Sequence, residues 1–435
     1  MASLSLLTVP FQRLTTYECL AGCPIISEMI SEGEPHFTSG SKGTEHKMQE
    51  SEALETMSLI RGGAFYRFQE VAHLIRPNQW NAVRRIFIAT LVGWVPLLVL
   101  TAVSGSHESL IAFLKDYRVF ARVFIAVPLL IAGQKTIEER FRLIVRHFFD
   151  ADLLRPEDLP RFRAILTTIK KLKDAWFPEL ALIALGCVGG IVFVGNELMF
   201  DAPWSVRIVG KISPSPAGWY FELVTQTIYM VLLGLALWKW FLYVLFFWRV
   251  SRLQLQLVPC DPDRSGGLGF LGYSPSAFLP VVIAGATAVG SVLRYQALHS
   301  EFSNESLATG LVVWVIVILL VFVGPLGFFA AKLTHLYRAG YVEYGSLAHL
   351  HAEQFQEKWV HQRQGNLGDL LVAEEINTLS NLASSLDRVR RITLIPIDRL
   401  TLIEVIVAAA VPMLPVILTQ VPLSELLRMI FRALV

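Results

Sequence analysis

The residues best suited to binding chemistry gather in one short glycine-rich turn, PCDPDRSGGLGFLG, at positions 259–272. Its candidate ligand-binding residues are Asp261, Asp263, Arg264, Gly266, Gly267 and Gly269. The carboxylates could hold a cation, and the guanidinium with exposed backbone amides could hold an anionic headgroup or a phosphate. In a competing interpretation the turn is structural, because Asp-Pro favours a turn, Gly-Gly allows positive φ, and an Asp–Arg pair fixes the angle between two helices. Both interpretations are open, and we favour the structural one.

A second group of candidates lies inside apolar segments, where a charge costs about 2.5–3.5 kcal/mol on insertion scales. These intramembrane candidates are Arg122, Lys239 and Glu404, with Pro412 and Pro415 as breaks in the last apolar segment. Arg122 and Lys239 could simply extend to the membrane surface, and Glu404 could be an acid at the start of a helix. A joint role for Arg122 and Glu404 requires that both face one cavity. The prolines either unwind a helix, which frees carbonyls for an ion or substrate, or kink a packed helix.

Motifs for catalysis are missing from the sequence. It contains no Ser/His/Asp set, no HExxH motif and no P-loop. Gly267-Leu268-Gly269 invites comparison with nucleotide-binding loops, but no strand precedes it and the full fingerprint is absent. The four cysteines, Cys19, Cys23, Cys187 and Cys260, show neither zinc spacing nor a disulfide framework. We therefore expect no metal and no other cofactor, and these absences argue against an enzyme without excluding one.

The elements that must position these residues are apolar helices. The 435 residues are 54% hydrophobic and only 17% charged, with a mean hydropathy of +0.51, whereas a soluble domain is about 25% charged. The apolar residues fall in seven blocks: 86–105, 119–133, 176–195, 219–248, 277–293, 307–331 and 402–421. Since a helix that crosses the membrane needs about 20 apolar residues, we predict six spanning helices. The seventh block, broken by proline, either spans or re-enters.

The distribution of basic residues predicts the orientation of these helices. With the N-terminus inside, 29 of the 38 Lys and Arg residues fall in the inner segments 1–85, 134–175, 249–276 and 332–401. The outer loops hold only 5. Because cytoplasmic loops carry an excess of Lys and Arg, the N-terminus is predicted to be cytoplasmic.

The resulting fold is an all-α polytopic transmembrane helical bundle with cytoplasmic helical extensions. The chain is predicted to divide into four parts. Residues 1–56 are an extension that is disordered or reflects a misassigned start site, and 57–331 are a transmembrane core with a helical cytoplasmic loop at 134–175. Residues 332–401 are a cytoplasmic helical region, and 402–435 contain a Pro-broken segment and an amphipathic C-terminal helix. The partners expected are the lipid bilayer, with anionic headgroups at the basic loops. The helical region could also mediate self-association, and no nucleic-acid partner is expected.

The chain from Met57 onward resembles a family of bacterial multi-pass inner-membrane proteins that has no assigned activity. The resemblance rests on RGGAFYR at 61–67, on PDRSGGLGFL at 262–271, and on VPMLP at 411–415 leading to PLSELL at 422–427. Family members often carry His where this chain has Cys260 or Asp261, which weakens a metal role at the turn. The resemblance implies a bacterial inner-membrane location and a helical architecture, and it implies no function.

Three functions compete. The first is a channel or transporter for a small solute or ion, favoured by the Pro-broken seventh block, the small residues of block 277–293 and the embedded charges. The second is a sensory or scaffolding protein that presents cytoplasmic helices to partners. The third is an enzyme that modifies lipid headgroups, with Asp261, Asp263 and Arg264 near the substrate.

Overall fold

The chain divides into two units, 1–53 and 54–435, and every residue described in this computed structural model belongs to the second. The described residues are 82–195, 204–209, 211–299, 304–361 and 374–416. The predicted N-terminal extension, the motif at 61–67 and the amphipathic C-terminal segment therefore lie outside them.

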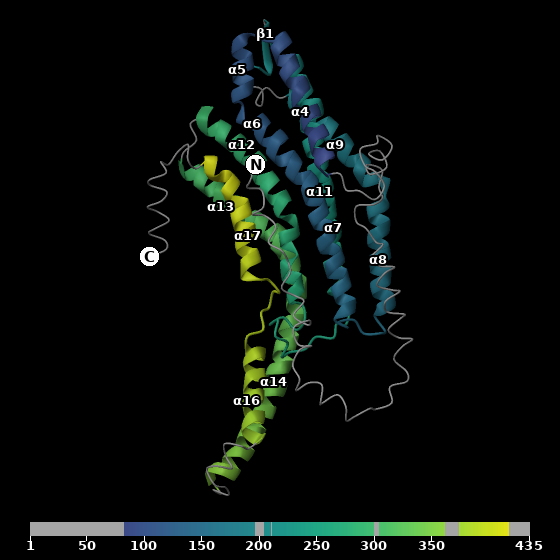
Figure 1. Ribbon diagram of the computed structural model, residues 1–435, viewed down its shortest axis with the longest axis vertical. Coiled ribbons are helices and arrows are strands. Elements are labelled where there is room, and N and C mark those ends of the chain that lie inside the picture. The colour runs from purple at the N-terminus through teal and green to yellow at the C-terminus, as the bar shows by residue number, and fades with distance from the viewer. Residues whose placement is uncertain (1–81, 196–203, 210, 300–303, 362–373, 417–435) are drawn as a thin grey trace, which may run out of the picture. The chain divides into compact units, whose positions relative to one another are not determined.

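Helices dominate the second unit (Figure 1), so the prediction of an all-α polytopic bundle is confirmed. The first half contains α4 Ala82–Ser104, α5 His107–Lys115, α6 Tyr117–Phe120, η1 Ala121–Ala126, α7 Val127–Asp150, α8 Leu159–Asp174, α9 Trp176–Gly195, α10 Pro216–Tyr220, η3 Phe221–Gln226 and α11 Thr227–Val250. The second half contains η4 Gly269–Tyr273, η5 Pro275–Phe278, α12 Leu279–His299, α13 Asn304–Val323, η6 Gly324–Phe329, α14 Ala330–Phe355, η7 Gln356–His361, α16 Glu374–Arg390, α17 Arg399–Ala410 and η8 Val411–Met413. A small antiparallel hairpin, β1 Val206–Val209 and β2 Lys211–Pro214, connects α9 to α10.

Six helical stretches in the described part of the chain are long and apolar enough to cross a membrane. They are Ala82–Ser104, Tyr117–Asp150, Pro216–Val250, Gly269–Arg294, Thr309–Lys358 and Arg399–Val416. The apolar helix α9 adds a further predicted crossing. The protein is therefore a multi-pass integral membrane protein.

The first two helical hairpins of the bundle have the same construction. In each, the returning helix begins with a short α-helical stretch, passes through a six-residue π-helical segment and continues as a 24-residue α-helix. In the first hairpin these parts are α6, η1 and α7, and in the second they are α10, η3 and α11. The two π-helical segments thus begin at equivalent places, one turn into each returning helix.

Packing defines the two ends of the bundle. At one end, which we call the α5 end, Phe113, Val119, Trp204 and Phe221 form a small apolar cluster that joins α5, α6, the hairpin connection and η3. At the other, which we call the loop end, aromatic rings of α7, α8 and α11 pack edge to face. The segment 251–278 covers this loop end and pairs with the α7–α8 connection through the bridge between Leu154 and Leu255.

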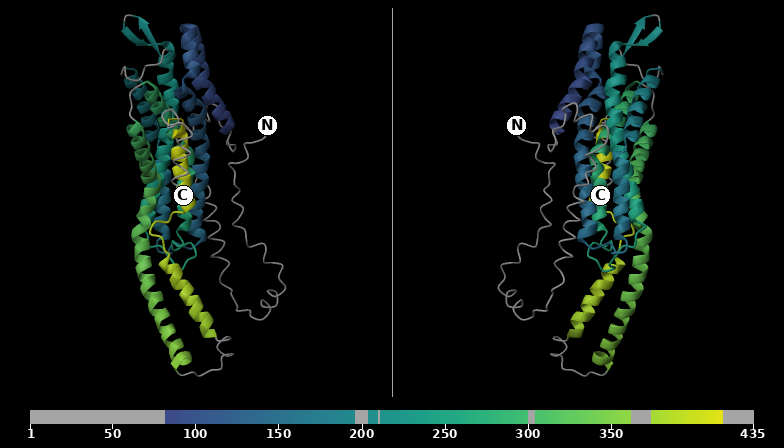
Figure 2. Two further views of the ribbon diagram at one scale, coloured as in Figure 1. Left: turned by 90° about the vertical axis from the view of Figure 1, so that its left-hand side faces the viewer. Right: turned by 90° about the vertical axis from the view of Figure 1, so that its right-hand side faces the viewer.

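Two long helices continue from the loop end and lie side by side (Figures 1 and 2). They are α14 and α16, and they form most of the region 332–401 that was predicted to be helical and polar. The sequence placed the start of this region at residue 332, and α14 begins at Ala330, directly after the 3-10 segment η6. No proline lies within α14, so the helix runs unbroken from its apolar into its polar part.

Candidate functional site

The glycine-rich turn at 259–272, here called the junction loop, uses its polar groups to hold its own shape. The Asp263 carboxylate accepts the backbone N–H of Ser265 at 2.8 Å and that of Gly269 at 2.7 Å. The Asp261 carboxylate accepts the N–H of Asp263 at 2.9 Å. Two of the amides that could have bound an anion are therefore already occupied by a carboxylate.

Positive φ angles in the junction loop allow a close approach to neighbouring segments. Arg264, Gly266 and Gly267 have φ of 58°, 65° and 96°. The Arg264 carbonyl accepts the N–H of Thr393 at 2.9 Å, although its own side chain is exposed. A Cβ at Gly266 would collide with Leu336 of α14, so only glycine fits there.

Aromatic and backbone contacts attach the junction loop to three other segments. The Phe270 ring lies 4.2 Å from the ring of His147 and 5.1 Å from that of Phe148, both on α7. A Cβ at Gly272 would lie 2.9 Å from the carbonyl oxygen of Pro396. The junction loop therefore joins the end of α7 to α14 and to the α16–α17 connection, and this arrangement supports its structural interpretation.

The other residues singled out in the sequence do not meet at one place. Glu404 is exposed on α17, which packs against α12 and α13, so the structure does not bring it to Arg122. Lys239 is half-buried on α11 between two tryptophans. Pro412 lies in the 3-10 turn η8, and its carbonyl oxygen is 3.1 Å from the position of a Cβ at Gly290. Pro415 is half-buried in the helical turn that follows. This close approach to α12 favours a packed kink over an unwound helix.

Arg122 is the exception, because it is buried among polar side chains of a second helix. It lies in η1 with only 8% of its surface exposed, and Glu222 of η3 is 6% exposed. The charges of these two groups interact, and the Arg122 guanidinium carbon lies 5.5 Å from the centre of the Phe221 ring. Gln226 and Tyr229, both buried, belong to the same region of that helix. We call Arg122, Glu222, Gln226 and Tyr229 the intramembrane polar cluster.

The intramembrane polar cluster retains unsatisfied hydrogen-bonding groups. Nε of Arg122 and Oε1 of Gln226 are buried without a hydrogen-bond partner in the described part of the chain. A buried polar atom left unpaired costs about 1–3 kcal/mol, so a fold selected for stability alone would not keep both. The Arg122 Nε–H can donate to a ligand, and Oε1 of Gln226 can accept from one.

The backbone beneath the intramembrane polar cluster is unusual in both helices. Arg122 is the second residue of η1, and Glu222 is the second residue of η3. In η1 the widened turn is closed by the N–H of Val127, which donates to the carbonyl of Arg122 five residues earlier. Single π-helical turns inside α-helices occur often at functional sites.

Helix α4 holds the two π-helical segments together. Thr225 of η3 donates its hydroxyl to the carbonyl of Gly93 at 2.9 Å. A Cβ at Gly93 would lie 3.6 Å from Val123 of η1 and 3.8 Å from Thr225. The Thr225 hydrogen bond and the position of Val123 place Gly93 of α4 against both π-helical segments.

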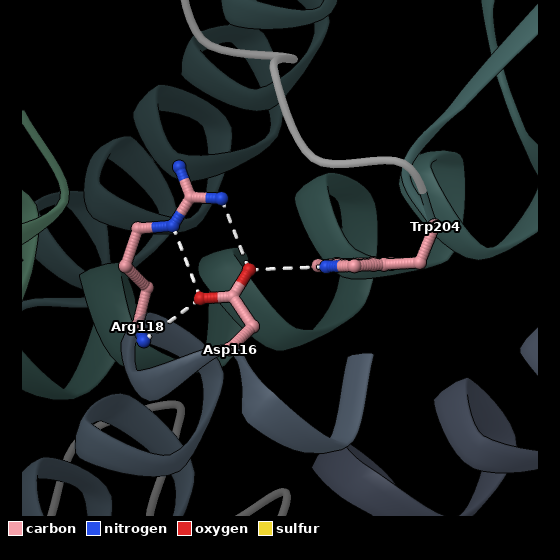
Figure 3. A network of polar contacts seen from close by, with 3 residues as sticks. All are labelled: Asp116, Arg118 and Trp204. Atoms are coloured by element: carbon pink, nitrogen blue, oxygen red, sulfur yellow. Dashed lines mark hydrogen bonds and ion pairs between the residues drawn. The ribbon is translucent and has the colours of Figure 1, made fainter. Parts of the chain in front are cut away.

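Toward the α5 end, the polar groups above the cluster are paired (Figure 3). The Asp116 carboxylate accepts from Arg118 Nε at 3.1 Å, Arg118 Nη2 at 3.0 Å, the Arg118 backbone N–H at 2.9 Å and Trp204 Nε1 at 3.0 Å. These bonds pair Arg118 with Asp116 and fix the start of α6, one turn before Arg122. The arrangement positions Arg122 without using its guanidinium.

A second buried polar level lies nearer the loop end. Arg85 of α4 donates from Nη2 to Oε1 of Gln134 at 3.4 Å, and Arg142 donates from Nη2 to Oε1 of Glu138 at 2.7 Å. Arg85, Gln134 and Glu138 are at most 6% exposed. Oε2 of Glu138 is buried and has no hydrogen-bond partner among the residues described.

No known family model, curated protein or solved structure matches this chain. The resemblance to a family of bacterial inner-membrane proteins therefore stays a prediction. Arguments about function rest on the geometry of the site.

Sequence reasoning identified Arg122 but missed the residues around it. Glu222 was inside the predicted block 219–248, and a lone acid within a membrane segment is itself a signal of function. Glu138 and Gln134 were assigned to a polar loop beyond the second block, where a charge is unremarkable. Their burial, with Gln134 bonded to Arg85 of α4, is a tertiary feature with no local signal in the sequence.

Proposed function

We propose that this protein is a channel or transporter that moves a small ion across the membrane through the intramembrane polar cluster. The observation that carries the proposal is the burial of Arg122 and Glu222 on two neighbouring π-helical segments within membrane-spanning helices. Ionisable residues in membrane segments are costly, face the protein interior and mark ion pathways. Their placement at equivalent points of two similar hairpins supports a shared role.

A purely structural role accounts poorly for the cluster. Replacing a buried charge pair by apolar residues is often neutral or stabilising by about 1–4 kcal/mol. The bundle elsewhere packs Phe, Leu and Ile at comparable depth, so apolar alternatives were available. Retaining Arg122 and Glu222 is explained if their charges are used.

The orientation and location that we propose follow the distribution of charge. The loop end carries α8 with exposed Arg161, Arg163, Lys170 and Lys171, and these face the anionic headgroups of the cytoplasmic leaflet. Basic residues accumulate on the cytoplasmic side of membrane proteins, so the loop end is placed inside. The sequence resemblance supports the inner membrane of a bacterium.

Currents from proteoliposomes on a solid-supported membrane test this proposal. Concentration steps of KCl, NaCl and HCl are applied in turn, and the displaced charge is compared with that of protein-free liposomes. We expect charge displacement for at least one ion, and a reduction of about tenfold or more in Arg122→Gln and in Glu222→Gln, because each loses a group that the ion needs.

Matched variants separate this effect from a general loss of charge. Arg146→Gln removes an arginine from the same helix α7 that forms an exposed ion pair with Asp150 at 3.2 Å. Glu404→Gln removes an exposed acid of α17. Both should displace charge as the unchanged protein does. The proposal is overturned if no ion displaces charge, or if Arg122→Gln is as active as Arg146→Gln.

A second function is supported by the surface of α14. Val342 and Leu350 are 68% and 54% exposed on this helix, and Tyr341 and Leu347 are 45% and 46% exposed. An apolar surface on a helix beyond the membrane bundle suits a protein partner or a second copy of the chain. Co-purification of a partner that is lost in Val342→Ser with Leu350→Ser would support a scaffolding role.

A further inference from the structure

We propose that the ion moved by this protein is the proton, and that Glu222 and Glu138 are the two carboxylates that carry it. This inference rests on the proposed function and specifies its substrate. Two nearly buried carboxyl groups, 6% and 5% exposed, lie at two levels of the same group of helices. Arg122, level with Glu222, and Glu138 are 16 residues apart in continuous helix, or about 24 Å at 1.5 Å per residue. This span is most of a hydrocarbon core of about 30 Å.

The burial of Glu222 suits a proton better than a larger ion. Arg122 of η1 and Arg118 of α6 both act on Glu222, and their positive charges repel a metal cation. An anion attracted to Arg122 would be repelled by Glu222 itself. The two arginines also oppose protonation of Glu222, but burial favours the neutral acid that forms when a proton bonds to one carboxylate oxygen. Uptake of the proton then releases Arg122 from its interaction with the carboxylate.

Glu138 has a free oxygen for the same proton. Its Oε1 accepts from Arg142, and its Oε2 is buried without a partner in the described residues. Because Arg142 pairs with the other oxygen, Oε2 is the position at which Glu138 can accept a proton. The other polar groups at this level are Arg85 of α4, which bonds Gln134 one turn earlier, and Tyr243 of α11, whose ring packs on Phe141. Arg140, also on α7, instead bonds Ser276 at 3.3 Å.

An apolar layer separates the two carboxylates. Ala126 and Leu130 follow Arg122 at intervals of four residues, before Gln134 and Glu138, and both are 0% exposed. Successive members of this series lie about one turn apart along the helix and about 40° apart around it, so the series winds around the helix as it passes from polar to apolar and back to polar. Proton transfer across it requires transient water or a helix movement, which prevents a permanent leak. In one transfer, Glu222 gains a proton from one side, passes it to Glu138, and Glu138 releases it to the other side, so both end as carboxylates.

Proton uptake into proteoliposomes tests the inference. Liposomes contain the full chain, the pH indicator pyranine and KCl, and valinomycin in a low-potassium buffer sets an inside-negative potential that drives protons inward. We expect acidification several-fold faster than in protein-free liposomes. Glu222→Gln and Glu138→Gln should each reduce the rate to that of protein-free liposomes.

Neighbouring acids provide the controls. Glu139→Gln changes the residue next to Glu138, which is exposed and pairs with Lys135 at 3.5 Å, and Glu404→Gln changes an exposed acid elsewhere. Both should acidify at the unchanged rate. Glu138→Asp keeps a titratable carboxyl and should retain part of the flux, which excludes misfolding as the cause of loss in Glu138→Gln.

The outcomes distinguish this inference from the proposed function. Charge displacement by K⁺, Na⁺ or Cl⁻ that depends on Arg122, with no proton uptake, would support the proposed function. It would contradict the inference that the transported ion is the proton. Full proton uptake in Glu138→Gln would also overturn it. If neither protons nor other ions move, both proposals fail together.

Discussion

The intramembrane polar cluster and the junction loop both contain charged residues, but they differ in whether their polar groups have hydrogen-bond partners. In the junction loop, the Asp263 carboxylate is shared between two backbone amides. In the cluster, Nε of Arg122 and Oε1 of Gln226 are buried with no partner in the described structure. Satisfied polar groups stabilise a fold, whereas unsatisfied ones reduce its stability and are retained for use. We therefore assign a structural role to the junction loop, the more conspicuous motif in the sequence, and a functional role to the intramembrane polar cluster.

The largest expected effect tests whether the charges of the intramembrane polar cluster serve function rather than stability. Arg122→Leu leaves Glu222 buried without its countercharge and should lower the free energy of unfolding by about 3–5 kcal/mol. The double variant Arg122→Leu with Glu222→Leu should return to the stability of the unchanged protein or exceed it, while ion movement stays lost. Thermal unfolding of the detergent-solubilised protein, followed by tryptophan fluorescence, measures this.

A structural role for the cluster would give another pattern. If the double variant were as unstable as Arg122→Leu alone, the charges would be required for packing. The comparison with the junction loop would then lose its basis.

The next largest effect concerns Asp263. Asp263→Ala leaves two backbone amides without an acceptor, including that of the buried Ser265, and should lower the free energy of unfolding by about 3 kcal/mol. The same thermal unfolding measurement applies. Arg264→Ala removes an exposed side chain from the neighbouring position and should stay within about 0.5 kcal/mol of the unchanged protein.

A binding role for the junction loop would reverse this ranking. In that case Arg264→Ala would abolish binding of anionic lipid vesicles, and Asp263→Ala would keep its stability. Either result would move the functional assignment back toward the loop.

The sequence predicted the architecture well because a membrane imposes simple rules on it. Apolar length and the distribution of Lys and Arg are local properties, and five of the six long apolar helices correspond to predicted spans. The sixth, Arg399–Val416, is the Pro-broken block whose crossing the sequence left open. The positive φ values at Gly266 and Gly267 were likewise expected from the turn composition. These features need no knowledge of which helices touch.

The site could be predicted only in part, because it depends on contacts between helices. Arg122 was visible as a charge in an apolar block, but its neighbour Glu222 is 100 residues away in the sequence. No local sequence pattern predicts the π-helical turns of η1 and η3, which lie inside otherwise regular helices. The burial of Glu138 is likewise invisible to a helical hydropathy pattern.

The smallest expected effect lies in the junction loop, at Asp261. Burial raises the pKa of this carboxyl, and the side chain of Asp263 raises it further, although the Asp263 N–H bond opposes the rise. A pKa above the unfolded value means that the folded state holds its proton longer. The resulting stability is present at low pH and is lost as the pH rises from about 4 through the folded pKa.

Asp261→Asn removes that titration and keeps an oxygen that can accept the Asp263 N–H at the distance of 2.9 Å found for the carboxylate. The melting temperature of the variant relative to the unchanged protein should therefore rise slightly as the pH increases above about 4, and then level off. Asp261→Ala also removes the hydrogen bond, so it should add a decrease that is the same at every pH. A melting-temperature difference for Asp261→Asn that does not change with pH would show that folding does not raise the pKa of Asp261. The junction loop would then be satisfied at every carboxylate, and its contrast with the intramembrane polar cluster would be complete.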